Sequence, residues 1–404
     1  MADKVKVKHI DADAEAKSHL AEQLERAKIE RVPEILTVIL FALFIAAFAI
    51  SFWIVPDRDF SEEENRVLET FPKVTQKSIV LGEFTEKFAD YMADQFPLRD
   101  AFVGVKGAAE IALGKRENNS VFILGDTLAE RFDEVNETNV SRNLEGTDAF
   151  IAACRERGVN ARFAVFGRAM DLTDVPIYGD APTDAAFALL EGHDSIDMRE
   201  ALDGHEDEYV YYRTDHHHTS LGAYYAYDFL AQYYGYEANS LVHYTREAAS
   251  DSFYGTTWSK AGAKWISPDV IEYFHWDGDD GVKVTIYESV TETKVYEGMY
   301  FRDYLEKKDK YASLLESATR GRVDVTTPGA DKPKLLVIKD SFAHSLVPFL
   351  AEHYNVTMID PRYYNQPVIK LVEDEGFDEV LICCNMATLS SSADFAKLQI
   401  GLQD

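Results

Sequence analysis

The chain has 404 residues, 46% of them hydrophobic and 12% aromatic, so it is long and apolar enough to build a sizeable core and is not a disordered chain. Its 41 Lys and Arg stand against 70 Asp and Glu, a formal net charge of −29 that disfavours binding to nucleic acids and to anionic surfaces. The three cysteines, Cys154, Cys383 and Cys384, provide neither a disulfide framework nor a zinc-binding spacing.

The N-terminal part predicts one membrane-spanning helix. Residues 1–34 form a polar tail of mixed charge, whereas residues 35–55 carry no charge and, at about 1.5 Å per residue, are long enough to cross a bilayer. The length of the apolar run and the polar leader before it favour a retained anchor over a cleaved signal peptide. The bias of basic residues, with Arg26, Lys28 and Arg31 just before the run, predicts a cytoplasmic N-terminus and an extracytoplasmic C-terminal domain.

The remaining sequence predicts a juxtamembrane linker over residues 56–80 and an α/β domain over residues 81–404. Two amphipathic segments between Gly82 and Leu113, separated by Pro97, predict a helical hairpin at the start of this domain. Apolar runs then alternate with helical patterns, which predicts a mostly parallel sheet with helices on both faces. A β-rich insertion is expected near residues 245–300. The predicted strands are 121–124, 161–166, 208–212, 334–338, 356–359 and 379–384, and the clearest helices are 221–234 and 342–353.

The first candidate site is the segment YYRTDHHHTS, which follows the predicted strand 208–212. Asp215 precedes His217 by two positions, so its carboxylate can hold one tautomer of the imidazole if the loop curls back. Three successive histidines with a carboxylate are also a conceivable metal site, although neighbouring side chains in an extended segment point to opposite faces. Solvent-exposed histidines at a helix start are the third interpretation.

The second candidate is KLLVIKDSFAHS, in which an apolar strand runs into Asp340 and Ser341 and then directly into a helix. A serine at such a turn is exposed beside the positive end of the helix, as in a nucleophile elbow, although the glycines of that motif are absent. The alternative is that Asp340 or Ser341 only caps the helix. The two segments together supply a nucleophile, a base and an orienting carboxylate.

DHHHTSLGAYYAY, KDSFAHSLVPFL, NRVLETFP and ADQFPLRDAF resemble the bacterial DHHW protein family, which is related to SGNH-hydrolase-like proteins of polysaccharide O-acetylation of the AlgX/AlgJ type. The resemblance runs from about Asn65 to the C-terminus. It implies a three-layer α/β/α SGNH-like domain with Ser341 as nucleophile, His217 as general base and Asp215 as its partner.

The sequence departs from the family pattern at two places. His218 stands where the family has the Trp of its DHHW motif, and Glu316, Ser317 and Ala318 replace a Gly-Gly-Asn turn. Other residues are weaker candidates for contacts with substrate or with an oxyanion, each with a structural role as the alternative. They are His218, Arg168 and Asn385, which follow predicted strands or the Asp-x-His segment, and Tyr254, whose ring suits stacking on a sugar.

These features predict a membrane-anchored, extracytoplasmic O-acetyltransferase or acetylesterase that acts on a cell-envelope or exported polysaccharide and needs neither metal nor cofactor. The resemblance implies a membrane-bound O-acyltransferase as a partner that delivers the acyl group. The alternatives are a non-catalytic envelope scaffold or carbohydrate-binding protein of the same fold, and a manganese phosphoesterase of the DHH type, for which the upstream aspartate motifs are missing.

The charge distribution bears on the substrate. Residues before Ile35 carry seven basic and eight acidic side chains and residues 35–55 carry none, so −28 of the −29 charges belong to the part after the anchor. A neutral or cationic glycan therefore fits better than a polyuronate, which would need local basic groups such as Arg168 or Arg213.

Overall fold

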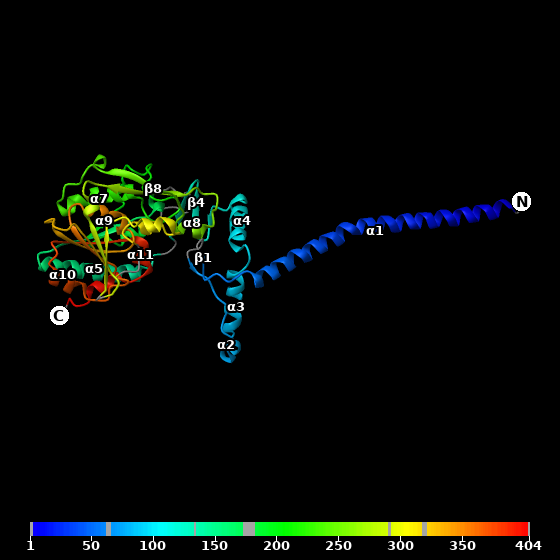
Figure 1. Ribbon diagram of the computed structural model, residues 1–404, viewed down its shortest axis with the longest axis horizontal. Coiled ribbons are helices and arrows are strands. Elements are labelled where there is room, and N and C mark those ends of the chain that lie inside the picture. Colours follow the sequence, from blue (N-terminus) through cyan, green and yellow to red (C-terminus); the bar gives the residue numbers. More distant parts are fainter. Residues whose placement is uncertain are drawn as a thin grey trace. The chain divides into compact units, whose positions relative to one another are not determined.

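The computed structural model of the chain describes residues 3–61, 66–132, 135–172, 182–289, 292–316 and 321–402. The chain divides into two compact units. The first comprises Met1–Ser61 and Arg66–Phe102, and the second comprises Glu62–Asn65 and Val103–Asp404. Figure 1 shows the first unit in blue to cyan and the second in cyan to red.

The first unit is dominated by α1 (Asp3–Ile54), a single helix whose segment Arg31–Ile54 is long and apolar enough to cross a membrane. The polar tail and the predicted anchor are thus parts of one continuous helix. Residues 56–80, predicted as a linker, contain the short strands β1 (Phe60–Ser61) and β2 (Arg66–Val67) and the helix α2 (Gln76–Val80). The two helices predicted on either side of Pro97 are α3 (Glu83–Asp94) and α4 (Arg99–Ala112).

The second unit is built on an eight-stranded sheet of order β11-β10-β12-β14-β13-β15-β6-β7. Strands β14, β13, β15, β6 and β7 run parallel to one another, and β12, β10 and β11 extend the sheet in antiparallel fashion. Their bounds are β6 (Asn160–Phe166), β7 (Ser195–Asp197), β10 (Lys283–Tyr287), β11 (Thr293–Glu297), β12 (Arg322–Thr326), β13 (Lys334–Lys339), β14 (Asn355–Ile359) and β15 (Glu379–Asn385).

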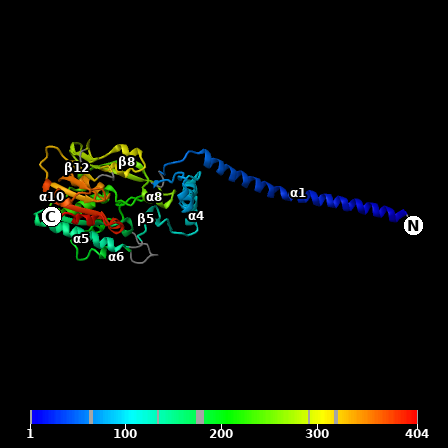
Figure 2. The same cartoon turned by 90° about the horizontal axis from the view of Figure 1, so that it is seen from below.

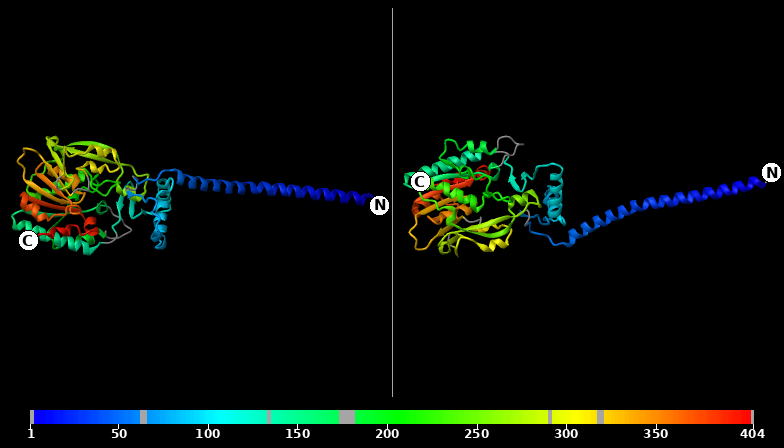
Figure 3. Two further views of the ribbon diagram at one scale, coloured as in Figure 1. Left: turned by 60° about the horizontal axis from the view of Figure 1, so that its bottom comes forward. Right: turned by 90° about the horizontal axis from the view of Figure 1, so that it is seen from above.

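Both faces of this sheet are buried, because successive side chains of a strand point to opposite faces. In β13, Leu335 and Val337 join one apolar cluster with α7 (Ser220–Tyr234) and α9 (Ala343–Leu350). Leu336 and Ile338 join another cluster with α5 (Glu137–Glu156), α10 (Val368–Glu375) and α11 (Met386–Ser391). Figures 2 and 3 show α5 and α10 along one face of the sheet. The predicted α/β fold class is confirmed, with three antiparallel strands added to the five parallel ones.

Smaller elements border the sheet. Strands β3 (Glu117–Asn118), β4 (Val121–Leu124) and β5 (Thr127–Glu130) form a three-stranded sheet, and α6 (Pro182–Ala188) precedes β7. Within 245–300, β8 (Thr245–Phe253) and β9 (Asp269–His275) pair as a separate two-stranded sheet, with α8 (Thr256–Ala261) between them in sequence, whereas β10 and β11 extend the main sheet.

The strand predicted over residues 208–212 is wrong. These residues form a loop that turns back on itself, with only an isolated bridge between Tyr211 and His218. The run of Tyr and Val predicts a strand because aromatic and β-branched residues are enriched in strands, where they pack on the sheet surface. Val210, Tyr211 and Tyr212 are indeed buried, but they are buried as part of a loop.

Candidate functional site

The loop that carries the Asp-x-His segment is organised by Asp269, a fully buried carboxylate at the start of β9. Its oxygens accept hydrogen bonds from the Arg213 N–H at 2.9 Å, from the Thr214 N–H at 2.8 Å and hydroxyl at 2.5 Å, and from the Tyr209 hydroxyl. Hydrogen bonds to a charged acceptor are among the stronger ones in proteins. Asp269 therefore fixes the backbone just before Asp215.

Asp215 is buried and accepts four hydrogen bonds. Oδ1 accepts from the backbone N–H of His217 at 3.1 Å and lies 2.5 Å from its Nδ1, and Oδ2 accepts from the Thr256 N–H at 2.8 Å and hydroxyl at 3.1 Å. The loop thus curls back as the dyad requires. Burial alone would raise the pKa of Asp215, but His216, His217 and these hydrogen bonds lower that pKa well below its usual range.

His217 connects this carboxylate to Ser341. Its Nε2 lies 2.7 Å from Ser341 Oγ, across 124 residues of sequence. The imidazole stacks on the ring of Tyr311 with a centroid distance of 3.9 Å and an interplanar angle of 9°. Because Asp215 Oδ1 accepts from Nδ1, Nε2 carries the lone pair and faces the hydroxyl. The three side chains form a continuous hydrogen-bonded chain from carboxylate to hydroxyl.

Ser341 lies in the turn between β13 and α9. Asp340 shapes this turn: Oδ1 accepts from the Phe342 N–H at 3.0 Å, and Oδ2 accepts from the Asn385 N–H and the Thr388 hydroxyl, both at 2.8 Å. The Tyr311 hydroxyl donates to the Ser341 carbonyl at 2.9 Å. No side chain caps α9, whose N-cap is Phe342, so the capping role considered for Ser341 is not observed. Its hydroxyl faces His217 instead.

A buried lysine, Lys339, contacts polar side chains beside this turn. Lys339 Nζ, at the end of β13, lies 2.8 Å from Nε2 of His344 in α9 and 3.5 Å from a carboxylate oxygen of Asp360. Burial lowers the pKa of His344 well below its usual value, so its neutral ring accepts a hydrogen bond from the lysine. This contact ties the residues on either side of Ser341 together.

The tautomer of His216 follows from the hydrogen bonds around it. The Thr256 hydroxyl donates its proton to Asp215, so His216 Nδ1, 3.0 Å away from that hydroxyl, must be the donor to it. His216 Nε2 then carries a lone pair, and no side chain or backbone group among the described residues bonds to it. Burial and the neighbouring His217 lower the pKa of His216 to about 4, which keeps this acceptor available at neutral pH.

The same three residues are close enough to bind a metal, because Asp215, His216 and His217 each place a ligand atom within 4.8 Å of the others. Both oxygens of Asp215 and both ring nitrogens of His217 already take part in hydrogen bonds. A cation at this site would have to break the chain that leads to Ser341. The geometry therefore favours acid–base chemistry over a metal centre.

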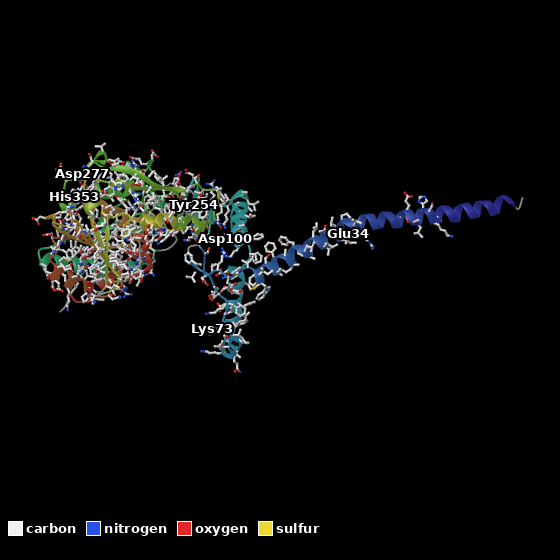
Figure 4. The ribbon with its side chains drawn as sticks, in the orientation of Figure 1. Glu34, Lys73, Asp100, Tyr254, Asp277 and His353 are labelled. Atoms are coloured by element: carbon white, nitrogen blue, oxygen red, sulfur yellow. The ribbon has the colours of Figure 1, made fainter. Side chains whose placement is uncertain are left out.

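Tyr254 is the weaker candidate that lies beside the dyad. With Phe253, Gly255 and Thr256 it lines a pocket that reaches Asp215, and Lys308 and Asp309 close the other side. Its ring packs against Trp258 at a centroid distance of 4.4 Å (Figure 4 labels Tyr254). Tyr254 is half-buried.

Arg168, Asn385 and His218 are engaged in contacts within the protein. Arg168 is buried and pairs with Glu130 at 3.1 Å. The Asn385 amide donates to the carbonyls of Phe166 and Gly167 at 3.3 and 2.6 Å, while its oxygen caps α11. His218 is buried against Phe166 and Phe342, and its Nδ1 lies 3.0 Å from Ser345 Oγ.

Of the residues that replace the Gly-Gly-Asn turn, Ser317 and Ala318 lie outside the described residues. Glu316 and its neighbour Leu315 have φ values of 50° and 59°, the left-handed region that favours glycine. The Tyr304 hydroxyl donates to Glu316 at 3.1 Å. Without the glycines, the backbone still adopts a conformation that is typical of glycine.

Sequence reasoning missed Asp269, Gly255, Thr256 and Tyr311. A Cβ atom at Gly255 would lie only 2.3 Å from Asp215 Cβ and Oδ2, so only glycine leaves room for the carboxylate. Gly255 and Thr256 directly follow Tyr254, a residue that the sequence suggested only for sugar stacking and not for support of Asp215. Asp269 and Tyr311 stand alone in the sequence without any motif.

Comparison with known proteins gives a match to one family model and several similar solved structures. The family model described as DHHW protein matches residues 194–359. A DHHW family protein from Eubacterium siraeum DSM 15702 has a similar structure, with a TM-score of 0.59 and 20% identity, over 70% of this chain and 95% of that one. The structure of PatB1 from Bacillus cereus with a sulfonyl adduct is similar with a TM-score of 0.56 and 18% identity, over 68% of this chain and 98% of that one.

The O-acetyltransferase domain of AlgJ from Pseudomonas putida gives a TM-score of 0.42 with 12% identity over 69% of this chain and 98% of that one. A search of curated proteins finds no match. At these identities the structural similarities concern the fold alone. The matched region contains Asp215, His217 and Ser341, and the predicted resemblance of this chain to the DHHW family is confirmed over residues 194–359.

Proposed function

We propose that this protein is a membrane-anchored, extracytoplasmic O-acyltransferase or esterase with an SGNH-like domain. Ser341 is the nucleophile, His217 the general base and Asp215 the group that orients and stabilises the imidazolium. The observation that carries this proposal is the distance of 2.7 Å between Ser341 Oγ and His217 Nε2, combined with the 2.5 Å contact of His217 Nδ1 to Asp215. The arrangement of five parallel strands between helical layers supports the SGNH-like class.

The proposed reaction has two acyl transfers. Ser341 Oγ attacks the carbonyl carbon of an acyl ester while its proton passes to His217 Nε2, and the negative charge that develops lies near the positive N-terminal end of α9. The C–O bond to the leaving alcohol then breaks, and His217 returns the proton to that alcohol. In the second step His217 takes the proton of a sugar hydroxyl or water, whose oxygen attacks the acyl carbon; the bond to Ser341 Oγ breaks, and His217 returns the proton to Ser341. A sugar acceptor gives a transferase and water gives an esterase.

The charges around the site favour a neutral or cationic glycan as the acceptor. Arg168 pairs with Glu130 at 3.1 Å, and Arg213 lies 3.2 Å from Asp126 and 3.6 Å from Asp269. Both arginines that could have received an anionic polymer are thus already neutralised. The resemblance to polysaccharide O-acetylation proteins supports an acetyl group as the acyl unit and a membrane-bound O-acyltransferase as its donor.

A retained anchor is supported by the packing at the end of α1. Phe52 is only 6% exposed and its ring contacts Tyr91 at a centroid distance of 5.6 Å. Removal of the apolar segment as a signal peptide would leave a hole in the first unit. N-terminal sequencing of the mature protein should find the chain uncleaved within 35–55, and a cytoplasmic N-terminus should be protected from external protease in intact cells.

The enzymatic proposal is tested with the full chain in detergent. The wild type and a Ser252→Ala control, altered at an exposed serine in β8, should release p-nitrophenol from its acetate ester, and Ser341→Ala should not. A fluorophosphonate that reacts with activated serines should label the first two proteins only. Equal activity of Ser341→Ala refutes the proposal. Polysaccharide binding without any labelling of Ser341 would instead favour the non-catalytic scaffold.

A further inference from the structure

The bend between α3 and α4 in the first unit exposes an apolar surface. Phe96, Leu98 and Phe102 are 40%, 69% and 45% exposed. Leu98 also has a φ of 58°, a left-handed conformation that is unfavourable for a residue with a Cβ. Glycine or asparagine would relieve this strain. For the isolated protein, leucine is unfavourable here both because its apolar side chain is exposed and because its backbone is left-handed. We call Phe96, Leu98 and Phe102 the elbow residues.

The elbow residues are joined to the apolar part of α1. The Phe48 ring stacks on Phe96 at a centroid distance of 5.4 Å and meets Phe102 at 5.8 Å. Phe44 contacts Phe48 in turn at 4.7 Å. The apolar surface of the bend therefore continues without interruption into the segment Arg31–Ile54, which is long and apolar enough to span a bilayer.

A polar framework fixes this arrangement from the other side. Gln95 accepts from the Arg58 N–H and donates to the Arg58 carbonyl, both at 2.9 Å. Arg58 also pairs with Asp100 at 2.9 Å (Asp100 is labelled in Figure 4), and the Tyr91 hydroxyl donates to Asp57 at 3.1 Å. Because these bonds hold α3 and the start of α4 to the residues that follow α1, the bend cannot swing away from the helix end.

The depth of the elbow follows from the helix rise. Phe48 precedes Ile54 by six residues, which corresponds to about 9 Å along the helix axis. Arg31–Ile54 extends about 36 Å, against a hydrocarbon core of about 30 Å, so the Ile54 end projects about 3 Å beyond the core if the span is centred. Phe48 then lies about 6 Å inside the core, and the rings that contact it reach the same boundary region.

We propose that the elbow residues insert into the lipid bilayer and give the protein a second membrane contact beside its anchor. The occupant of this surface is lipid and not a protein partner, because the surface is continuous with a segment whose own partner is lipid. The inference rests on the membrane anchoring by α1 that is part of the proposed function. Its consequence is a fixed orientation of the first unit on the extracytoplasmic side of the bilayer.

The test places a fluorescent probe at Leu98 in the full chain, reconstituted into phosphatidylcholine vesicles. Three variants with one added cysteine each, Leu98→Cys, Ile45→Cys and Val242→Cys, are labelled with a thiol-reactive, environment-sensitive dye. The native cysteines are fully buried and their thiols have raised pKa values, so they react slowly. Ile45 reports on the anchor, and Val242, which is 93% exposed in the second unit, is the aqueous control.

Lipids brominated on their acyl chains should quench most of the emission at Ile45 and at Leu98 and leave Val242 unchanged. Quenching at Ile45 without quenching at Leu98 overturns the inference and leaves the anchor intact. Absence of quenching at Ile45 overturns the anchor and the inference with it. Protection of Leu98 from aqueous iodide without quenching by brominated lipid would show that protein, such as a second copy of this chain, covers the elbow residues, and it also overturns the inference. Phe96→Cys repeats the measurement at a second position of the bend.

Discussion

Gly255→Ala is the sharpest test of the way in which Asp215 is held. The added Cβ would lie 2.3 Å from Asp215 Cβ and Oδ2 and 2.6 Å from Cγ. Carbon atoms in contact sit at roughly 3.5 Å, so the carboxylate has to retreat by about 1 Å. Gly255 has a φ of −80°, which alanine adopts freely, so the clash is the only penalty. The expected destabilisation is about 1–3 kcal/mol, typical of overpacking.

The effect on the site should exceed the effect on stability. Moving Asp215 lengthens its 2.5 Å contact to His217 and frees the imidazole to take the wrong tautomer. Misplacement of about 1 Å costs on the order of 100-fold, and loss of the orienting carboxylate in a serine triad costs about 10⁴-fold in kcat. We therefore expect the rate of p-nitrophenyl acetate hydrolysis to fall by about 10²–10⁴-fold, equivalent to roughly 3–5 kcal/mol.

Gly281→Ala is the matched control, because a Cβ there meets nothing within 4 Å. It should keep wild-type activity and melting temperature. Near-ultraviolet circular dichroism establishes that Gly255→Ala remains folded before its rate is compared. If the folded variant keeps its activity within about threefold, a change of under 1 kcal/mol, Asp215 does not need the position described above and the reasoning is wrong.

Three further predictions concern the neighbours of the site. Tyr311→Phe removes the 2.9 Å hydrogen bond to the Ser341 carbonyl but keeps the ring stack on His217. Because one neutral hydrogen bond is worth about 1 kcal/mol, kcat for the same ester should fall by about 5–10-fold at unchanged KM. An unchanged kcat would contradict a positioning role for Tyr311. Asp269→Asn replaces a carboxylate that accepts four hydrogen bonds. The free energy of unfolding in urea should therefore fall by about 3 kcal/mol, and activity should be lost. Wild-type stability and activity would contradict the role of Asp269 in fixing the loop before Asp215. Burial lowers the pKa of His218 to about 3, so between pH 7 and pH 5 the unfolded chain binds a proton at this residue and the folded chain does not. The free energy of unfolding should therefore fall by about 2 kcal/mol through this group as the pH drops from 7 to 5. In urea titrations His218→Gln should show a pH-dependent loss of stability that is smaller by this amount, and an equal loss in both proteins would contradict the buried neutral imidazole.

The central strands were predictable because they are buried on both faces. Strands β13, β14 and β15 read as uninterrupted apolar runs, and the amphipathic pattern over 221–234 gives α7 nearly to the residue. The same reasoning failed at residues 208–212, where buried aromatic residues belong to a loop. There the Tyr212 N–H donates to the carbonyl of His217, and the Val210 carbonyl accepts from the Thr219 N–H, so these bonds stay within the loop.

The site was predictable where chemistry and sequence neighbours coincide. Asp215 and His217 are two residues apart, and Ser341 follows a strand at a turn, so local patterns pointed to each of them. Asp269 interacts with Thr214 across 55 residues and Tyr311 with Ser341 across 30, and a single sequence contains no sign of such long-range contacts. Gly255 is recognisable only once the position of the Asp215 side chain is known.

The separation of His217 and Ser341 by 124 residues has a consequence for the way in which activity appears during folding. Contacts between residues this far apart form late, because the chain between them must first be ordered. That chain includes β9, which supplies Asp269, and β13, which ends two residues before Ser341. The Ser341 hydroxyl and the His217 imidazole therefore meet only after the chain between them has folded. Ester hydrolysis by this protein should consequently report on completed folding, with partly folded chains inert toward surrounding esters.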